Sequence, residues 1–168
     1  ICQRAGVSKG AFYHHFPTKQ AVFLELFNRW LEGVNAQIEA IQSNKRTAPQ
    51  VFASLSMLIG RVLEDASGQV QMFLEFWTQA ARDPEIWQAT IAPYRTYQHL
   101  FAQIIERGIS EGSLRPVEPL VAGQAAVSMG VGLLLQAALD PQGADWDAVA
   151  RQSVQILMDG LADKEDKV

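Results

Sequence analysis

The sequence predicts an all-α protein, and three observations lead to that prediction. Apolar residues recur at three- and four-residue spacing along most of the 168 residues, which is the period of an amphipathic helix. No stretch of convincing length alternates apolar and polar residues, as a half-buried strand would. Proline and glycine stand mostly between the periodic segments, where they are typical of helix ends.

The N-terminal segment has the pattern of two short helices separated by a sharp turn. Gly6 can adopt the positive φ that ends a helix, and Ser8 is a suitable N-cap for a second helix over about residues 9–15. We expect three apolar side chains of this segment to face inward, namely Val7, Phe12 and Phe16.

A long helix is predicted over about residues 18–41, with Thr18 as its N-cap. Its apolar side chains recur on one face, and at 1.5 Å per residue it would span roughly 36 Å. A helix of that length can leave the N-terminal segment and enter the rest of the molecule, so we expect it to connect two parts of the protein.

Five further helices are predicted after the polar loop at residues 43–49. Their approximate ranges are 49–65, 70–82, 84–111, 119–139 and 145–161. Asp83 followed by Pro84 is a strong helix start. Pro93 should break or kink its helix near residues 89–92, because proline lacks the backbone N–H that the helix needs.

The N-terminal pattern resembles the DNA-binding motif of the TetR family of bacterial transcriptional regulators. In that family a pattern close to Ala-Gly-Val-Ser-Lys-Gly-Thr-x-Tyr-x-His-Phe-x-Ser-Lys recurs, and residues 1 to about 27 match it here. Ala11 replaces the usual threonine, and Thr18 replaces the usual serine while keeping the cap. The resemblance implies a partial helix-turn-helix DNA-binding head at residues 1–28, with its first helix expected before Ile1. It also implies a helical effector-binding and dimerisation body at residues 29–168.

The family's DNA-contacting positions carry over onto seven residues, and their chemistry agrees. Small residues at the start of a reading helix let its backbone approach base edges, lysine can reach a phosphate or a guanine, and tyrosine and histidine can donate to phosphate oxygens. At Ala11 only methyl contact with thymine remains. The expected contacts are Ser8, Lys9, Gly10, Ala11, Tyr13, His14 and Lys19.

The charge distribution fits a DNA reader better than the overall charge does. The whole chain has a net charge of −4, which alone argues against a nucleic-acid partner. Residues 1–31, however, hold four basic residues against Glu25 alone, whereas residues 32–168 hold ten basic and seventeen acidic residues. A basic end on an acidic body is the asymmetry expected for a DNA reader with a separate regulatory part.

The segment 119–139 has no charged residue over 21 positions, so a membrane span is one interpretation. A buried helix is favoured, because Gln124, Ser128 and Gln136 interrupt the apolar run and glycines lie inside it.

The last two predicted helices carry small and apolar faces that one small body would not fully cover. In TetR-like regulators this pair packs against its two-fold mate, and a symmetric homodimer with two heads suits a palindromic operator. Simple packing within the chain is the alternative. The expected interface residues are Ala122, Ala126, Gly130, Trp146, Val149, Ser153 and Leu157.

The central helices supply aromatic and flexible side chains that could line a ligand cavity or simply fill a core. The resemblance implies an apolar or aromatic small-molecule effector in this region. The candidate lining residues are Met57, Phe73, Phe76, Trp77, Trp87, Tyr94, Tyr97, Phe101 and Met129.

The sequence predicts neither an enzyme nor a metal or cofactor site. His14 and His15 are adjacent, so they point about 100° apart on a helix, and no phosphate loop or nucleophile elbow is present. A single cysteine, Cys2, fits a reducing cytoplasm. We therefore expect a cytoplasmic DNA-binding regulator that acts as a ligand-responsive repressor. The alternative is a helical ligand-binding or protein-interaction module that does not bind DNA.

Overall fold

The computed structural model describes residues 2–42, 46–65, 78 and 80–163. Within these residues the regular secondary structure is helical. The helices are α1 (Cys2–Ala5), α2 (Lys9–His15), α3 (Lys19–Gln42), α4 (Ala48–Asp65), α6 (Pro84–Ser110), α7 (Pro119–Leu139) and α8 (Trp146–Leu161). The described residues form no strand; one isolated bridge joins Leu114 to Ala162. The predicted all-α class is therefore confirmed.

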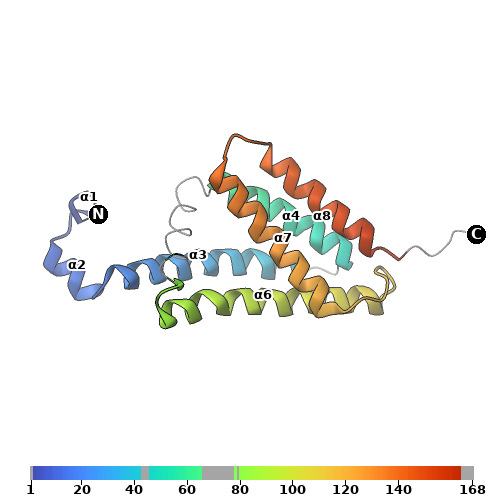
Figure 1. The fold of residues 1–168 in the computed structure, drawn as a ribbon, viewed down its shortest axis with the longest axis horizontal. Helices are drawn as coiled ribbons and strands as arrows, with labels where there is room; N and C mark the ends of the chain where they lie inside the picture. The colour runs from blue at the N-terminus through green and yellow to red at the C-terminus, as the bar shows by residue number, and fades with distance from the viewer. Residues whose placement is uncertain (1, 43–45, 66–77, 79, 164–168) are drawn as a thin grey trace, which may run out of the picture.

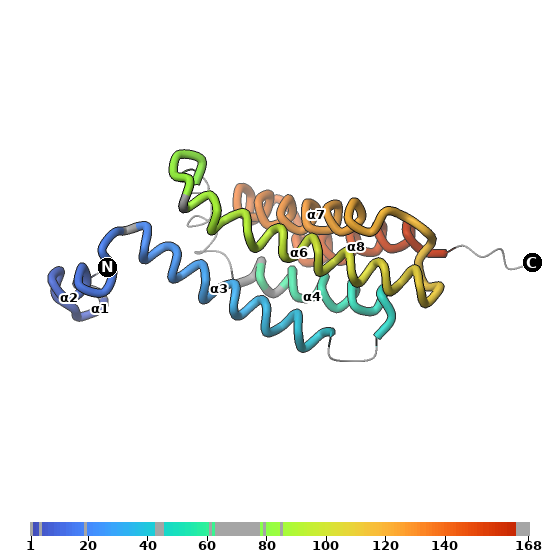
Figure 2. The backbone as a smooth tube through the Cα atoms, turned by 90° about the horizontal axis from the view of Figure 1, so that it is seen from below, coloured from blue at the N-terminus to red at the C-terminus, as the bar shows by residue number. Residues whose placement is uncertain are grey.

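The molecule is an elongated helical body with a small head at one end (Figures 1 and 2). Helices α1 and α2 form the head and lie beyond the body at the N-terminal end of α3. Helix α3 runs from the head into the body, where it contacts both α4 and α6. Its path is therefore the one predicted for a helix that connects two parts of the protein.

One large core holds the body together. It joins buried side chains of α3, α4, α6, α7 and α8, among which Val51 and Ile105 are completely buried. Near the head, Phe27 and Leu31 of α3 pack with Ile86 of α6 in a second, smaller cluster. The two clusters fix α3 against the body along much of its length.

Helices α6 and α7 approach unusually closely at Gly123. A Cβ atom placed there would lie 2.6 Å from the backbone oxygen of Gln98 and 2.8 Å from the backbone nitrogen of Ala102. Neither backbone atom can rotate away, so only glycine allows this spacing between the two helices.

The predicted helix boundaries agree closely with the structure, with two exceptions. The helix expected over 70–82 falls largely outside the described residues. Of the break or kink expected near Pro93, the break is wrong, since α6 continues through it. Proline removes one backbone hydrogen bond, but α6 is held by buried side chains on both sides of it, with Ile86 and Thr90 before Pro93 and Ile104 after it.

Helix α7 is long and apolar enough to cross a membrane, judged by length and composition alone. One side of it is buried in the protein, with Ala122, Gly123 and Leu133 as examples. The opposite side exposes apolar side chains, including Val121 and Leu139. The prediction of a buried helix therefore holds for one face only.

Candidate functional site

The head is built around a glycine turn and two hydroxyl caps. Gly6 has φ of +66°, the left-handed conformation that the sequence predicts there. The Ser8 hydroxyl accepts a hydrogen bond from the backbone N–H of Ala11 at 3.1 Å. The Thr18 hydroxyl accepts one from the backbone N–H of Ala21, also at 3.1 Å. These contacts orient α2 between the turn and the start of α3.

Aromatic contacts support α2 from its inner side. The rings of Phe12 and Phe16 lie 5.7 Å apart, and Phe12 meets Tyr13 edge-on at 5.4 Å. Phe12 and Phe16 are partly buried, as expected, but Val7 is exposed, contrary to the prediction. Val7 directly follows the turn, and its N–H is held by the carbonyl of Cys2 at 3.1 Å.

The residues expected to contact DNA form the open surface of α2. Six of the seven are exposed, namely Ser8, Lys9, Gly10, Ala11, Tyr13 and His14. The backbone of Lys19 begins α3, while its side chain lies outside the described part of the structure. Exposed basic and hydrogen-bonding groups at the start of a short helix are the groups that duplex DNA requires.

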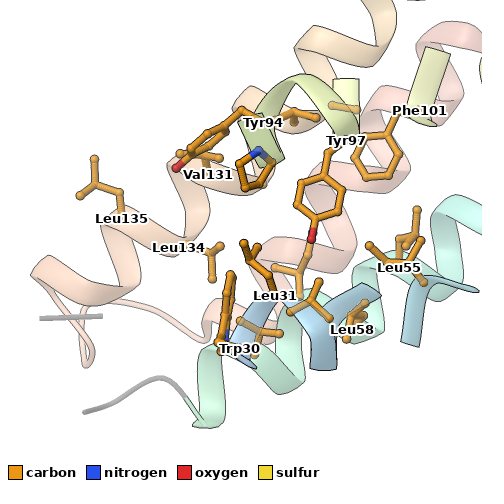
Figure 3. A pocket seen from close by; sticks show the side chains of 18 of the residues that line it. Trp30, Leu31, Leu55, Leu58, Tyr94, Tyr97, Phe101, Val131, Leu134 and Leu135 are labelled. Atoms are coloured by element: carbon orange, nitrogen blue, oxygen red, sulfur yellow. The ribbon is translucent and has the colours of Figure 1, made fainter. Parts of the chain in front are cut away.

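An apolar cavity of about 190 Å³ lies in the body between α3, α4, α6 and α7 (Figure 3). Five of its lining residues come from α3, the helix that starts at the head. The lining consists of Phe27, Trp30, Leu31, Val34, Ile38, Leu55, Leu58, Ile59, Val62, Pro93, Tyr94, Tyr97, Phe101, Ala126, Val127, Gly130, Val131, Leu134 and Leu135. Such a wall is suited to an apolar or aromatic ligand.

Tyr97 links two walls of the cavity. Its hydroxyl on α6 donates a hydrogen bond to the side-chain oxygen of Asn35 on α3, at 2.8 Å. Burial raises the pKa of Tyr97 to about 12, so the phenol is neutral at physiological pH.

Three of the nine candidate lining residues border this cavity. Tyr94, Tyr97 and Phe101 line it, whereas Phe73, Phe76 and Trp77 lie outside the described residues. Two predicted residues, Met57 and Trp87, are on the surface, with 57% and 47% of their area exposed. Met57 points away because the inward face of α4 is taken by Leu55, Leu58 and their neighbours.

The remaining predicted lining residue, Met129, packs beside the main core and not on the cavity. Sequence reasoning also missed most of the wall, which is aliphatic. Helical periodicity marks residues such as Leu31 and Leu58 as inward-facing, but it does not distinguish a cavity wall from a filled core.

Two residues expected at an interface between copies, Ala122 and Ala126, are instead buried within the protomer. Both belong to the main core of the chain, so they lack the surface that a second copy would need. Gly130 lines the cavity. The partly buried residues of α8 among the expected set are Trp146, Val149, Ser153 and Leu157.

Within the described part of the chain, no group of three or more His, Cys, Asp or Glu side chains could hold a metal ion. The described residues place the helix-turn-helix pattern and the apolar cavity along one continuous helix, α3. Comparison with protein families identifies the class of protein that has this arrangement.

Residues 1–26 match the family of tetR bacterial regulatory proteins, and residues 52–163 match the C-terminal domain of BetI-type transcriptional repressors. The second match alone covers more than half of the chain. The chain therefore belongs to the TetR family of bacterial transcriptional regulators.

A curated relative is the HTH-type transcriptional repressor KstR2 of Mycolicibacterium smegmatis, 23% identical over 118 residues. That match covers 69% of this chain and 56% of the relative, so the chain spans little more than half of that protein's length.

Two solved structures share the fold. A putative transcriptional regulator from Pseudomonas aeruginosa superimposes with a TM-score of 0.81 at 20% identity, covering 95% of this chain and 76% of that one. One from Saccharomonospora viridis, in complex with choline, gives a TM-score of 0.81 at 18% identity, covering 97% and 85%.

Proposed function

We propose that this protein is a repressor that binds operator DNA as a homodimer and releases it when a small molecule enters the cavity. One observation carries the proposal. Helix α3 begins at the Thr18 cap, against the DNA-reading motif, and the same uninterrupted helix supplies Phe27, Trp30 and Leu31 to the cavity wall.

The distance between the two functions is short. Phe27 lies eight residues after Lys19, which is about 12 Å along a helix at 1.5 Å per residue. A helix is stiff over that length, so a change in how α3 sits at the cavity changes the position of the head. The effector must bind more tightly to the arrangement that misfits DNA, because only differential affinity shifts an equilibrium.

The proposed DNA contacts are the exposed residues of α2 together with the start of α3. Lys9 and Lys19 supply charge to the phosphates, and Tyr13 and His14 supply hydrogen bonds. Ser8, Gly10 and Ala11 allow the backbone to approach base edges. Binding DNA in this way places the protein in the cytoplasm, with the chromosome.

The proposed dimer forms through α7 and α8. These helices expose Val121, Leu139 and Ile156, with 60%, 68% and 73% of their area accessible. Exposed apolar side chains on neighbouring helices favour an isologous interface, which would give two heads related by a two-fold axis. The outward faces of these helices replace Ala122 and Ala126 as the proposed contact.

The cavity is the reason for proposing a small organic effector. The related Saccharomonospora viridis regulator was solved with choline, so this fold accommodates small molecules. The apolar wall described above is suited to a different, less polar occupant in this chain.

The test is a fluorescence-anisotropy titration of the purified protein with its own upstream intergenic duplex and with a scrambled duplex of equal length. A specific regulator should prefer the native duplex by about 10³-fold or more. Equal, steeply salt-dependent binding to both duplexes would show that the protein binds DNA by electrostatic attraction without sequence preference. That result would contradict the proposal.

A further inference from the structure

The polar groups of the cavity are few. Within the described lining no side chain carries a charge, and the polar side-chain groups are the hydroxyls of Tyr94 and Tyr97 and the indole of Trp30. An ion entering such a space would lose part of its hydration without gaining a charged partner, which is costly. The wall therefore favours an uncharged molecule.

The size and shape of the cavity narrow the ligand further. A cavity of about 150 Å³ with an apolar wall holds benzene, and this one measures about 190 Å³. A compound of one or two rings is the right size. The flat faces of Trp30, Tyr94 and Tyr97 stand around the space (Figure 3), and aromatic side chains favour stacked or edge-on contacts with an aromatic ligand.

The two tyrosines differ in where their hydroxyls lie. The Tyr94 hydroxyl is at the outer side, beside Val131, whereas the Tyr97 hydroxyl points across the space toward α3 (Figure 3). The Tyr97 hydroxyl donates its one proton to Asn35. Its oxygen retains the ability to accept a hydrogen bond, so it can satisfy a ligand that donates one.

Resting on the proposed role as an effector-responsive regulator, we propose that the cavity takes an uncharged one- or two-ring aromatic compound that carries a hydrogen-bond donor, such as a phenol or an indole. Tyr97 is the residue that recognises the donor. A ligand with an acceptor alone would have to break the Tyr97–Asn35 bond, so it gains little over a purely apolar ligand.

The test measures binding of a matched set to the whole protein by calorimetry: naphthalene, 2-naphthol, 2-methoxynaphthalene, 2-naphthoate and choline. We expect 2-naphthol to bind about 3- to 10-fold more tightly than naphthalene, the range that one hydrogen bond provides. We expect 2-methoxynaphthalene to match naphthalene, and both ions to bind more weakly. Tighter binding of 2-naphthoate or choline than of 2-naphthol would overturn the proposal, as would no binding of any neutral compound.

Two variants and one control assign the effect to Tyr97. Tyr97→Phe should remove the preference for 2-naphthol, whereas the control Tyr94→Phe should keep it. Asn35→Ala changes an exposed residue and frees the Tyr97 proton, so 2-methoxynaphthalene should gain affinity over naphthalene in that variant. Asn35→Ala therefore tests the proposal even if Tyr97→Phe does not fold.

An unchanged preference in Tyr97→Phe, or an unchanged ratio in Asn35→Ala, would overturn the assignment of Tyr97. These binding measurements contain no DNA, so their outcome can contradict the ligand assignment without contradicting the proposed repressor function. Selective operator binding together with a preference for 2-naphthoate would contradict only the ligand inference. A preference for 2-naphthol together with equal binding to native and scrambled duplexes would contradict only the proposed repressor function.

Discussion

Replacing Gly123 by alanine tests the close approach of α6 and α7. The added Cβ would lie 2.6 Å from the Gln98 oxygen and 2.8 Å from the Ala102 nitrogen. Ordinary contacts begin near 3.4 Å, so the two helices must separate by several tenths of an ångström. Overpacking of this kind costs about 1–3 kcal/mol.

Alanine also has a higher helix propensity than glycine, by about 1 kcal/mol, and this gain opposes the clash. The matched control is Gly33→Ala on α3, where nothing lies within 4 Å of an added Cβ. The control gains propensity without a clash. The difference in stability between the two variants therefore measures the free-energy cost of overpacking at Gly123.

Thermal unfolding followed by circular dichroism, at one protein concentration, measures both variants. A protein of this size shifts by about 2–4 °C per kcal/mol, so Gly123→Ala should melt several degrees below Gly33→Ala. Equal stabilisation by both substitutions would refute the close helix contact. Loss of stability in Gly33→Ala would instead show that its site is not open.

Three further predictions concern the DNA surface, an interhelix contact and the dimer. Lys9→Ala should weaken binding to all duplexes and lower the salt slope by about 1, whereas removing the exposed body charge in Arg82→Ala should leave anisotropy titrations unchanged. Glu111 accepts a hydrogen bond from the first backbone N–H of α4, which, with Ser113 and Arg107, holds the pKa of Glu111 below 4.5. Its contribution to stability is therefore present above pH 4.5 and lost as the pH falls through the lowered pKa; Glu111→Gln should flatten that part of the curve of urea-unfolding free energy against pH, and an unaltered curve would contradict the contact. Ile156→Lys should convert dimers to monomers in sedimentation velocity, while Met57→Lys, at another exposed apolar site, should not; an intact Ile156→Lys dimer would place the interface elsewhere.

Local structure was well predicted because its causes are local. A positive-φ glycine at Gly6 and side-chain caps at Ser8 and Thr18 depend on residues within three positions. The apolar run at residues 119–139 became a helix with the same bounds, since Pro119 starts it and Asp140-Pro141 follows its end. The motif of the head could be predicted for the same reason.

Features that depend on tertiary contacts were not predicted. The chemistry of Pro93 predicted a break or kink in α6, yet the helix continues through it, with buried side chains on both sides of the proline. The stripe of Ala122 and Ala126 shows that another helix approaches, but not whether that helix belongs to the same chain. The aliphatic wall of the cavity has the same periodicity as a filled core, so only the packing of four helices reveals the space.

The coupling between cavity and head is tested most directly by measuring operator affinity with the cavity empty and with it saturated. Anisotropy would follow the labelled native duplex while 2-naphthol is added, with calorimetry establishing saturation under the same conditions. The account predicts that operator affinity falls by about 5- to 150-fold, the usual range of allosteric coupling, and that operator binding weakens 2-naphthol by the same factor. Unchanged operator affinity with a saturated cavity would contradict the account, because α3 would then carry no signal from the cavity to the head.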